Sequence, residues 1–260
     1  MITVYTRKEL YRLKEIGKIL KKEFKNNFTH MIVLETFISI VEYFESIELL
    51  FSKNNPDSAR SIYRTCLQSI ANLDFILNDD DKEQIFFKAN GYNFWCIQSI
   101  NYKVVKIMNN SEPQTKQEMF DTYIDLLRSK FKTDEFEKFQ DFLLQQRDLF
   151  FNTNNKRHWF NMFETHVNEQ TFISSQLGKE TEYFYQISSE YTHGNAVILN
   201  LGKLKNSSIN DFDKTFLKHI SLLFLNTTYK LIRLSKNTEP LEEHLNFLSD
   251  YFDKTNNTVF

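Results

Sequence analysis

The sequence predicts an all-α fold: a single-domain bundle of about ten antiparallel helices. Three observations predict it: scarce turn residues, apolar side chains at helical spacing, and repeated helix-start signals. Only 5 Gly and 3 Pro occur in 260 residues, whereas sheet proteins and doubly wound nucleotide-binding folds use these residues at their turns. The breaks between helices are short, and neither an internal repeat nor a Gly/Ser-rich linker is found. We therefore expect one domain over residues 1–260.

The first half of the chain is expected to form four long helices. The first, over 6–25, carries Leu10, Leu13, Ile16, Leu20 and Phe24 at steps of three and four residues. The strongest start signal is Asn55-Pro56-Asp57, because Asn can cap a helix, Pro suits its first position and Asp favours its positive end. The predicted ranges are 6–25, 30–54, 56–78 and 81–108.

The second half is expected to hold shorter helices separated by polar breaks. Pro113 places a turn over 109–115, and Thr115 with Glu118 forms a capping box for the next helix. Gly178 is expected to end a group of short helices. The predicted ranges are 116–131, 134–151, 159–177, 179–199 and 210–235, followed by a short helix from Pro240, so that the C-terminal helices cover 210–253.

The charge balance excludes a strongly basic protein. Lys and Arg number 32 and Asp and Glu 34, which gives a net charge of −2, and a chain that wraps DNA or covers a membrane usually has a basic excess. One local excess lies in residues 7–25, where eight bases and three acids give +5. This segment is either the solvated face of a helix or a contact for an anion or RNA.

The cysteines and the hydropathy indicate a reduced, cytoplasmic protein without metal or cofactor. Cys66 and Cys96 stand outside any Cys-x-x-Cys pattern, which argues against a zinc site or a disulfide framework. The longest uncharged run, Ala89 to Tyr102, is shorter than a membrane span. The first ten residues lack the apolar core of a signal peptide. We therefore predict no membrane association.

Two arginines on the third helix are candidate anion ligands. Arg60 and Arg64 lie one turn apart, on the side opposite the apolar stripe that includes Ile62 and Cys66. Two guanidinium groups at this spacing can hold a phosphate or a carboxylate. Alternatively, they pair with acidic residues of a neighbouring helix or lie in water.

The segment around residue 190 holds a candidate acid–base pair. Glu190 and His193 are three residues apart and so are neighbours on a helix. A carboxylate beside a histidine raises the imidazole pKa and orients the ring, which suits acid–base catalysis, although it also suits a simple stabilising pair. We predict that Arg60 and Arg64 meet Glu190 and His193 in the polar centre of the bundle.

Two known patterns are absent. A di-iron bundle would need a second Glu-x-x-His motif, which the chain lacks. The Arg, four to six residues, then His spacing of one class of helical endoribonucleases (the HEPN type) is also missing, although Arg60 or Arg64 could still meet His193 across helices.

The same residues resemble a bacterial family catalogued as domain of unknown function 5677. The resemblance rests on Ala59 to Gln68 with Asp79, on His158-Trp159, and on Tyr185 to Gly194, and it spans about 35–200. The family usually has Arg, three residues, then Glu; after Arg64 this chain has Gln68 at the position of that Glu. The resemblance implies an all-helical fold, a cytosolic bacterial setting and no established activity. Some members resemble neighbours of mobile or phage-defence genes.

Two functions follow as hypotheses. The first is an interaction or regulatory protein, or a component of phage defence, with a protein partner or a second copy of itself. The alternative is a metal-independent endoribonuclease in which His193 is the acid/base, Glu190 orients it, and Arg64 or Arg60 stabilises phosphate charge. Binding of RNA or of a small anionic ligand without catalysis stays open.

Overall fold

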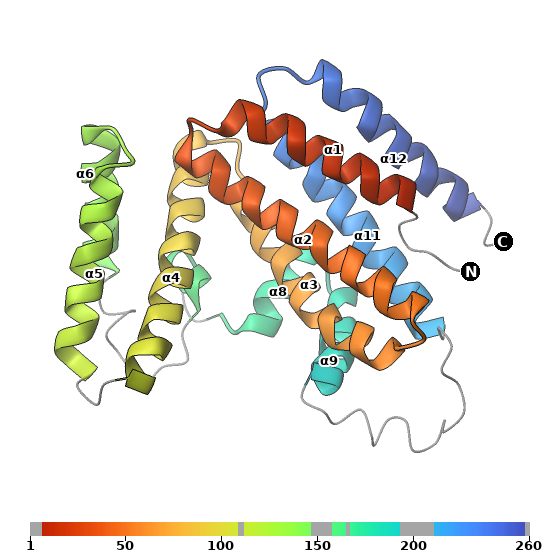
Figure 1. Ribbon diagram of the computed structural model, residues 1–260, viewed down its shortest axis with the longest axis horizontal. Coiled ribbons are helices and arrows are strands. Elements are labelled where there is room, and N and C mark those ends of the chain that lie inside the picture. The colour runs from red at the N-terminus through yellow and green to blue at the C-terminus, as the bar shows by residue number, and fades with distance from the viewer. Residues whose placement is uncertain (1–6, 109–111, 147–157, 165–166, 193–210, 258–260) are drawn as a thin grey trace. The chain divides into compact units, whose positions relative to one another are not determined.

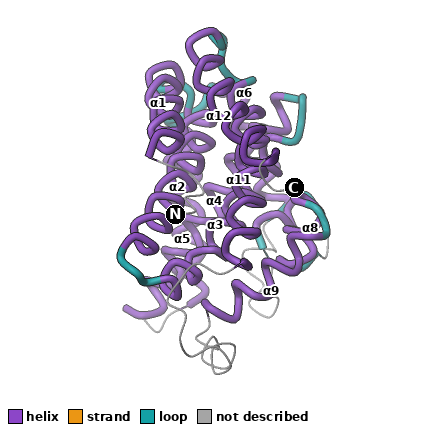
Figure 2. Tube along the Cα trace, turned by 90° about the vertical axis from the view of Figure 1, so that its right-hand side faces the viewer, coloured by secondary structure: helices purple, strands orange, loops and turns teal. Residues whose placement is uncertain are grey.

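Every regular element in the described part of the chain is helical. The computed structural model describes residues 7–108, 112–146, 158–164, 167–192 and 211–257, and within these ranges it has ten α-helices and one short 3-10 helix (Figure 2). The predicted all-α class is confirmed. The contacts divide the chain into two compact units, residues 1–78 with 170–260 and residues 79–169. The single domain over 1–260 stays a prediction.

The first unit is built around one central helix. This helix, α3 (Pro56–Leu77), packs against α2 (Phe28–Ser52), α9 (Glu180–Thr192) and α11 (Asp211–Ile232). More than half of the residues of α3 are buried, among them Tyr63, Cys66 and Ile70. The remaining helices of this unit are α1 (Arg7–Phe24), α8 (Glu169–Leu177) and α12 (Glu239–Asn257), with α1 between α2 and α12 (Figure 1).

The second unit has an aromatic core. It comprises α4 (Lys82–Met108), α5 (Glu112–Arg128), α6 (Thr133–Gln145) and η1 (Trp159–Met162). The buried Phe94 ring contacts Phe120 and Tyr123 edge-on, with ring centres 5.3 and 4.9 Å apart. Aromatic pairs of this geometry add to the stabilisation from area burial. Within the described residues of both units, no helix is at once long enough and apolar enough to cross a membrane.

Most predicted helix ends agree with the structure to within a few residues. The Asn55 side chain accepts a hydrogen bond from the Ser58 backbone at 3.4 Å, as a cap should. Gly178 has a φ of +97°, which only glycine adopts without strain, and it directly follows α8. The predicted extensions to residue 151 and to residue 199 lie outside the described residues.

The predicted start of the helix at residue 116 is wrong. The structure starts α5 at Glu112, so Pro113 and Thr115 lie inside its first turn instead of in a preceding turn. Proline is compatible with this position because the first backbone N–H groups of a helix have no partner within the helix. Thr115 therefore lies within the helix, and not before its first residue as the predicted capping box requires.

A polar contact joins α1 and α12 in the first unit. Arg12 Nη1 of α1 donates hydrogen bonds to Glu243 Oε1 at 3.0 Å and to His244 Nδ1 at 3.2 Å, both on α12. A histidine that accepts from arginine must be neutral at that nitrogen. Partial burial, with the positive charge of Arg12 as a second cause, holds the pKa of His244 below its ordinary value.

This contact predicts a loss of stability in acid. Because the pKa of His244 is lower in the folded chain, the unfolded chain binds the proton more readily. The contact therefore contributes to the free energy of unfolding above the unfolded pKa of about 6.5, and this contribution is lost as the pH falls below that value. The His244→Gln variant keeps an acceptor for Arg12 but does not titrate. Its free energy of unfolding, from urea titrations between about pH 8 and pH 5, should depend less on pH than that of the wild type. Equal pH dependence of the two proteins would contradict the assignment.

Candidate functional site

The candidate site lies where the first half of α3 faces α9 and α11. The Asn55 cap fixes the start of α3, and Asp57, Arg60 and Arg64 follow at steps of three and four residues on one side of the helix. The helices α9 and α11 both pack on α3. Arg60 is therefore buried and Arg64 half-buried, although the sequence places both opposite an apolar stripe.

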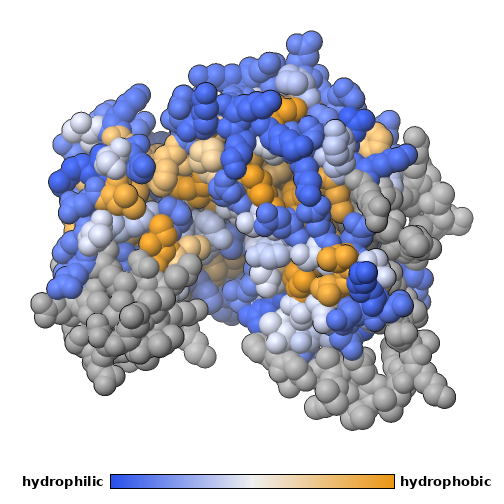
Figure 3. Space-filling view, viewed as in Figure 1, coloured by the Kyte–Doolittle hydropathy of each residue, from blue (hydrophilic) through white to orange (hydrophobic). Residues whose placement is uncertain are grey.

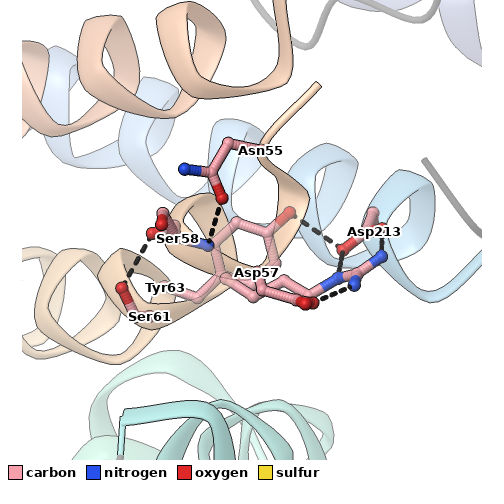
Figure 4. Close-up of polar contacts among 7 residues, drawn as sticks. Asn55, Asp57, Ser58, Ser61, Tyr63 and Asp213 are labelled. Carbon is pink, nitrogen blue, oxygen red and sulfur yellow. Dashed lines mark hydrogen bonds and ion pairs between the residues drawn. The ribbon is translucent and has the colours of Figure 1, made fainter. Parts of the chain in front are cut away.

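Arg60 is held in a buried ion pair. Its Nε donates to Asp213 Oδ1 at 2.9 Å and its Nη2 to Asp213 Oδ2 at 2.7 Å, which is the two-pronged geometry that suits guanidinium and carboxylate. Its Nη1 donates to Asp57 Oδ1 at 2.8 Å. The Arg60 residue is 3% exposed and Asp213 is 0% exposed. Figure 4 shows Asp213 on its own helix, opposite Asp57 and Tyr63 of α3.

Two tyrosines complete the surroundings of this pair. The Tyr63 hydroxyl donates to Asp213 Oδ1 at 3.1 Å, and the Tyr63 ring stacks on Phe216 with ring centres 4.1 Å apart. The Arg60 guanidinium carbon lies 5.4 Å from the centre of the Tyr191 ring of α9. One buried arginine thus joins three helices. We call Arg60, Asp213, Asp57, Tyr63 and Tyr191 the Arg60 cluster.

The cluster shifts the titration of its members. Burial alone would lower the pKa of Arg60, but the hydrogen bonds and the charge of Asp213 outweigh it and raise the pKa above its ordinary value. Burial, and then the negative charge of Asp213, raise the pKa of Tyr63 as well. Arg60 therefore stays positive and Tyr63 stays a neutral donor at any physiological pH.

Arg64 has a different environment, one turn further along α3. Its Nη1 donates to Ser189 Oγ at 3.1 Å and its Nη2 to the Tyr185 hydroxyl at 2.9 Å, both on α9. The guanidinium carbon also lies 5.1 Å from the centre of the Tyr185 ring. The Arg64 residue is only half-buried. Arg64 is therefore the more exposed of the two arginines.

Of the two residues predicted to meet the arginines, Glu190 and His193, the structure describes only Glu190. Glu190 lies on an exposed part of α9, and the carboxylates that hold Arg60 are Asp213 and Asp57. His193, with Gly194, lies outside the described residues. The residue before it, Thr192, donates from its hydroxyl to the Ser61 carbonyl at 3.3 Å and so joins the end of α9 to α3. The catalytic roles of His193, Arg64, Arg60 and Glu190 stay predictions.

Sequence reasoning missed Asp213, the main partner of Arg60. A signal for it existed, because Asp213 follows the helical spacing of Phe216, Leu217 and Ile220, all of which are buried. A carboxylate on an apolar stripe must find a partner once it is buried.

A second buried carboxylate lies further along α3 and is also engaged. Asp74 Oδ1 accepts from Lys230 Nζ at 2.7 Å and from the Thr227 hydroxyl at 3.0 Å, both on α11. Across the described residues, no group of three or more His, Cys, Asp or Glu side chains is placed to hold a metal ion. The polar residues between α3 and α11 therefore serve to fasten these helices together.

The Arg60 cluster predicts strong coupling between its two charges. Arg60→Leu leaves Asp213 buried without its arginine, and Asp213→Leu leaves Arg60 with only the exposed Asp57. Either change should lower the free energy of unfolding by about 3–5 kcal/mol. The double variant replaces the pair with apolar groups and should recover much of that loss. Urea unfolding of the three variants measures the coupling. Losses that simply add in the double variant would show that the two side chains do not depend on each other.

Comparison with known proteins supports the family resemblance. No curated protein and no solved structure matches the chain. A family of unknown function, DUF5677, matches residues 30–211, which is more than half of the chain and includes α2, α3 and α9. The site between α3 and α9 lies within the match, whereas α1 and α12 lie outside it. The chain therefore belongs to the family of unknown function DUF5677.

Proposed function

We propose that the protein acts by binding, as a helical interaction or regulatory component of the bacterial cytoplasm, and that its biological setting is phage defence. One observation carries the binding role. Arg60, one of the two arginines that could stabilise a phosphate during cleavage, is 3% exposed and already holds two carboxylates. A charge committed in this way stabilises the fold and does not reach an external substrate.

The surface of α9 also favours a protein partner over a nucleic acid. The helix carries Glu180, Glu182 and Glu190 and has neither lysine nor arginine. These acidic side chains repel phosphate groups. Tyr183 is 59% exposed on the same helix, and tyrosine is enriched where proteins bind each other. A second copy of this chain or another protein is thus a better partner for α9 than RNA.

A metal-independent endoribonuclease is the second candidate, and one observation favours it. Arg64 contacts Tyr185 and Ser189 of α9, and His193 directly follows this helix in the sequence. An arginine that neutralises phosphate and a histidine that moves a proton are sufficient for RNA cleavage without metal. This candidate requires both Arg64 and His193, and it assigns Glu190 to orient the histidine.

Incubation with RNA separates the two candidates. Purified wild type, His193→Ala and Arg64→Ala are mixed with a labelled single-stranded RNA in the presence of a metal chelator, and the RNA is examined on a denaturing gel. Because we propose binding without catalysis, we expect intact RNA with all three proteins. Expression of the wild type should be no more toxic to cells than expression of either variant.

Arg128→Ala is the matched control, because it removes an exposed arginine from the other unit. Circular dichroism shows whether each variant is folded. RNA cleavage by the wild type and by Arg128→Ala, lost in folded His193→Ala and Arg64→Ala, would overturn the proposal and establish the nuclease.

A further inference from the structure

The outer face of α1 carries a continuous stripe of exposed cationic side chains. Every third or fourth residue of this helix and of the turn after it is exposed, and all but one are lysines: Lys8, Tyr11, Lys14, Lys18, Lys22 and Lys25. The stripe spans about 25 Å at 1.5 Å per residue. The opposite face of α1 is apolar and buried against the bundle, with Leu13, Ile16 and Leu20 fully covered. Figure 3 shows that the surface over α1 and α12 is largely hydrophilic.

Part of this charge is neutralised within the protein. Lys14 pairs with Glu45 of α2 at 2.5 Å, Lys18 with Glu15 of α1 at 2.7 Å, and Lys21 with Glu35 of α2 at 3.7 Å. Lys22 and Lys25 form no ion pair among the described residues, and both are exposed. The C-terminal end of the stripe therefore carries positive charge that no ion pair within the described residues neutralises.

A third lysine joins this end from the segment between α11 and α12. Glu23 Oε1 accepts from the Lys236 backbone N–H at 2.7 Å, and Glu23 Oε2 accepts from the Ser235 hydroxyl at 2.6 Å. These bonds fix Lys236 beside the last turn of α1 and engage the one acidic residue between Lys22 and Lys25. The Lys236 residue is exposed. Lys22, Lys25 and Lys236 form what we call the lysine end of the bundle.

From this arrangement we infer that the lysine end, with Tyr11 further along the stripe, binds the phosphate backbone of single-stranded RNA. Exposed lysines recognise phosphate as point charges and do not read base sequence. Tyr11 is 57% exposed on the same face, and an exposed aromatic ring offers a surface on which a base can stack. An anionic membrane fits less well, because the apolar face of α1 is already buried and has nothing to insert into lipid.

This inference concerns a different surface from α9 and goes beyond the proposed function. It lies on an element outside the part of the chain that matches the family, residues 30–211. It predicts binding of RNA without cleavage. The two claims are therefore tested separately: release of RNA fragments contradicts the proposed function, whereas failure to bind RNA contradicts this inference.

The experiment measures the polarisation of a fluorescein-labelled single-stranded RNA as the full chain is added, at several salt concentrations. Three phosphate contacts predict that the logarithm of the affinity falls with the logarithm of salt concentration with a slope of about −2. The Lys22→Gln/Lys25→Gln double variant leaves one contact, so its slope should be about −0.7, and its affinity at low salt should be at least about tenfold weaker.

Two further variants separate charge from stacking and from general electrostatics. Tyr11→Ser should weaken binding by about tenfold through loss of base stacking, with the slope unchanged. Lys130→Gln/Lys132→Gln removes the same charge from exposed positions of the other unit and should bind as the wild type does. Thermal unfolding followed by circular dichroism confirms that each variant is folded.

Three results would overturn the inference. The first is absence of RNA binding by the folded wild type. The second is an equal loss of affinity in the Lys130/Lys132 control and in the Lys22/Lys25 variant, which would reflect net charge alone. The third is tighter binding to vesicles of phosphatidylglycerol and phosphatidylcholine than to RNA, which would assign the lysine end to a membrane surface.

Discussion

The buried contact between Arg60 and Asp213 is the constraint on which the first unit depends. A charged group removed from water must be neutralised nearby, and here both groups are buried and joined by two hydrogen bonds. The contact favours one register of α11 along α3, because a shift of one residue would leave the buried Asp213 without its arginine. Tyr191 over the guanidinium adds α9 to the same contact. Apolar packing brings these three helices together, and the charges select one way of aligning them.

Arg60 and Arg64 show how neighbouring residues of one type take different roles. They lie one turn apart on the same side of α3, yet Arg60 faces the carboxylate of α11 while Arg64 faces two hydroxyl groups of α9. Arg60 is buried and engaged by the carboxylates of Asp213 and Asp57. Arg64 is half-buried beside Tyr185 and Ser189 of α9.

The family match divides the chain into residues 30–211, which match the family model, and the residues outside this range. The match ends at Asp211, two residues before Asp213, so the Arg60 cluster joins the matched region to a helix that continues beyond it. The helices α1 and α12 lie outside the match and pack against each other through Arg12, Glu243 and His244. The lysine end, on α1, the turn after it and the segment between α11 and α12, also lies outside the match. The candidate site and the lysine end are thus distinct surfaces of one unit.

The sequence by itself determined the helical class, most helix positions and the family, because spacing, caps such as Asn55 and the scarcity of glycine are local properties of the chain. It also singled out the two arginines. It failed at Glu112, where a proline that can begin a helix was interpreted as a turn. Only the tertiary structure decided that Arg60 pairs with Asp213, 153 residues away, and that Arg64 meets Ser189. Such pairs depend on which helix faces are brought together by packing, and periodicity within one helix carries no information about the identity of its neighbour.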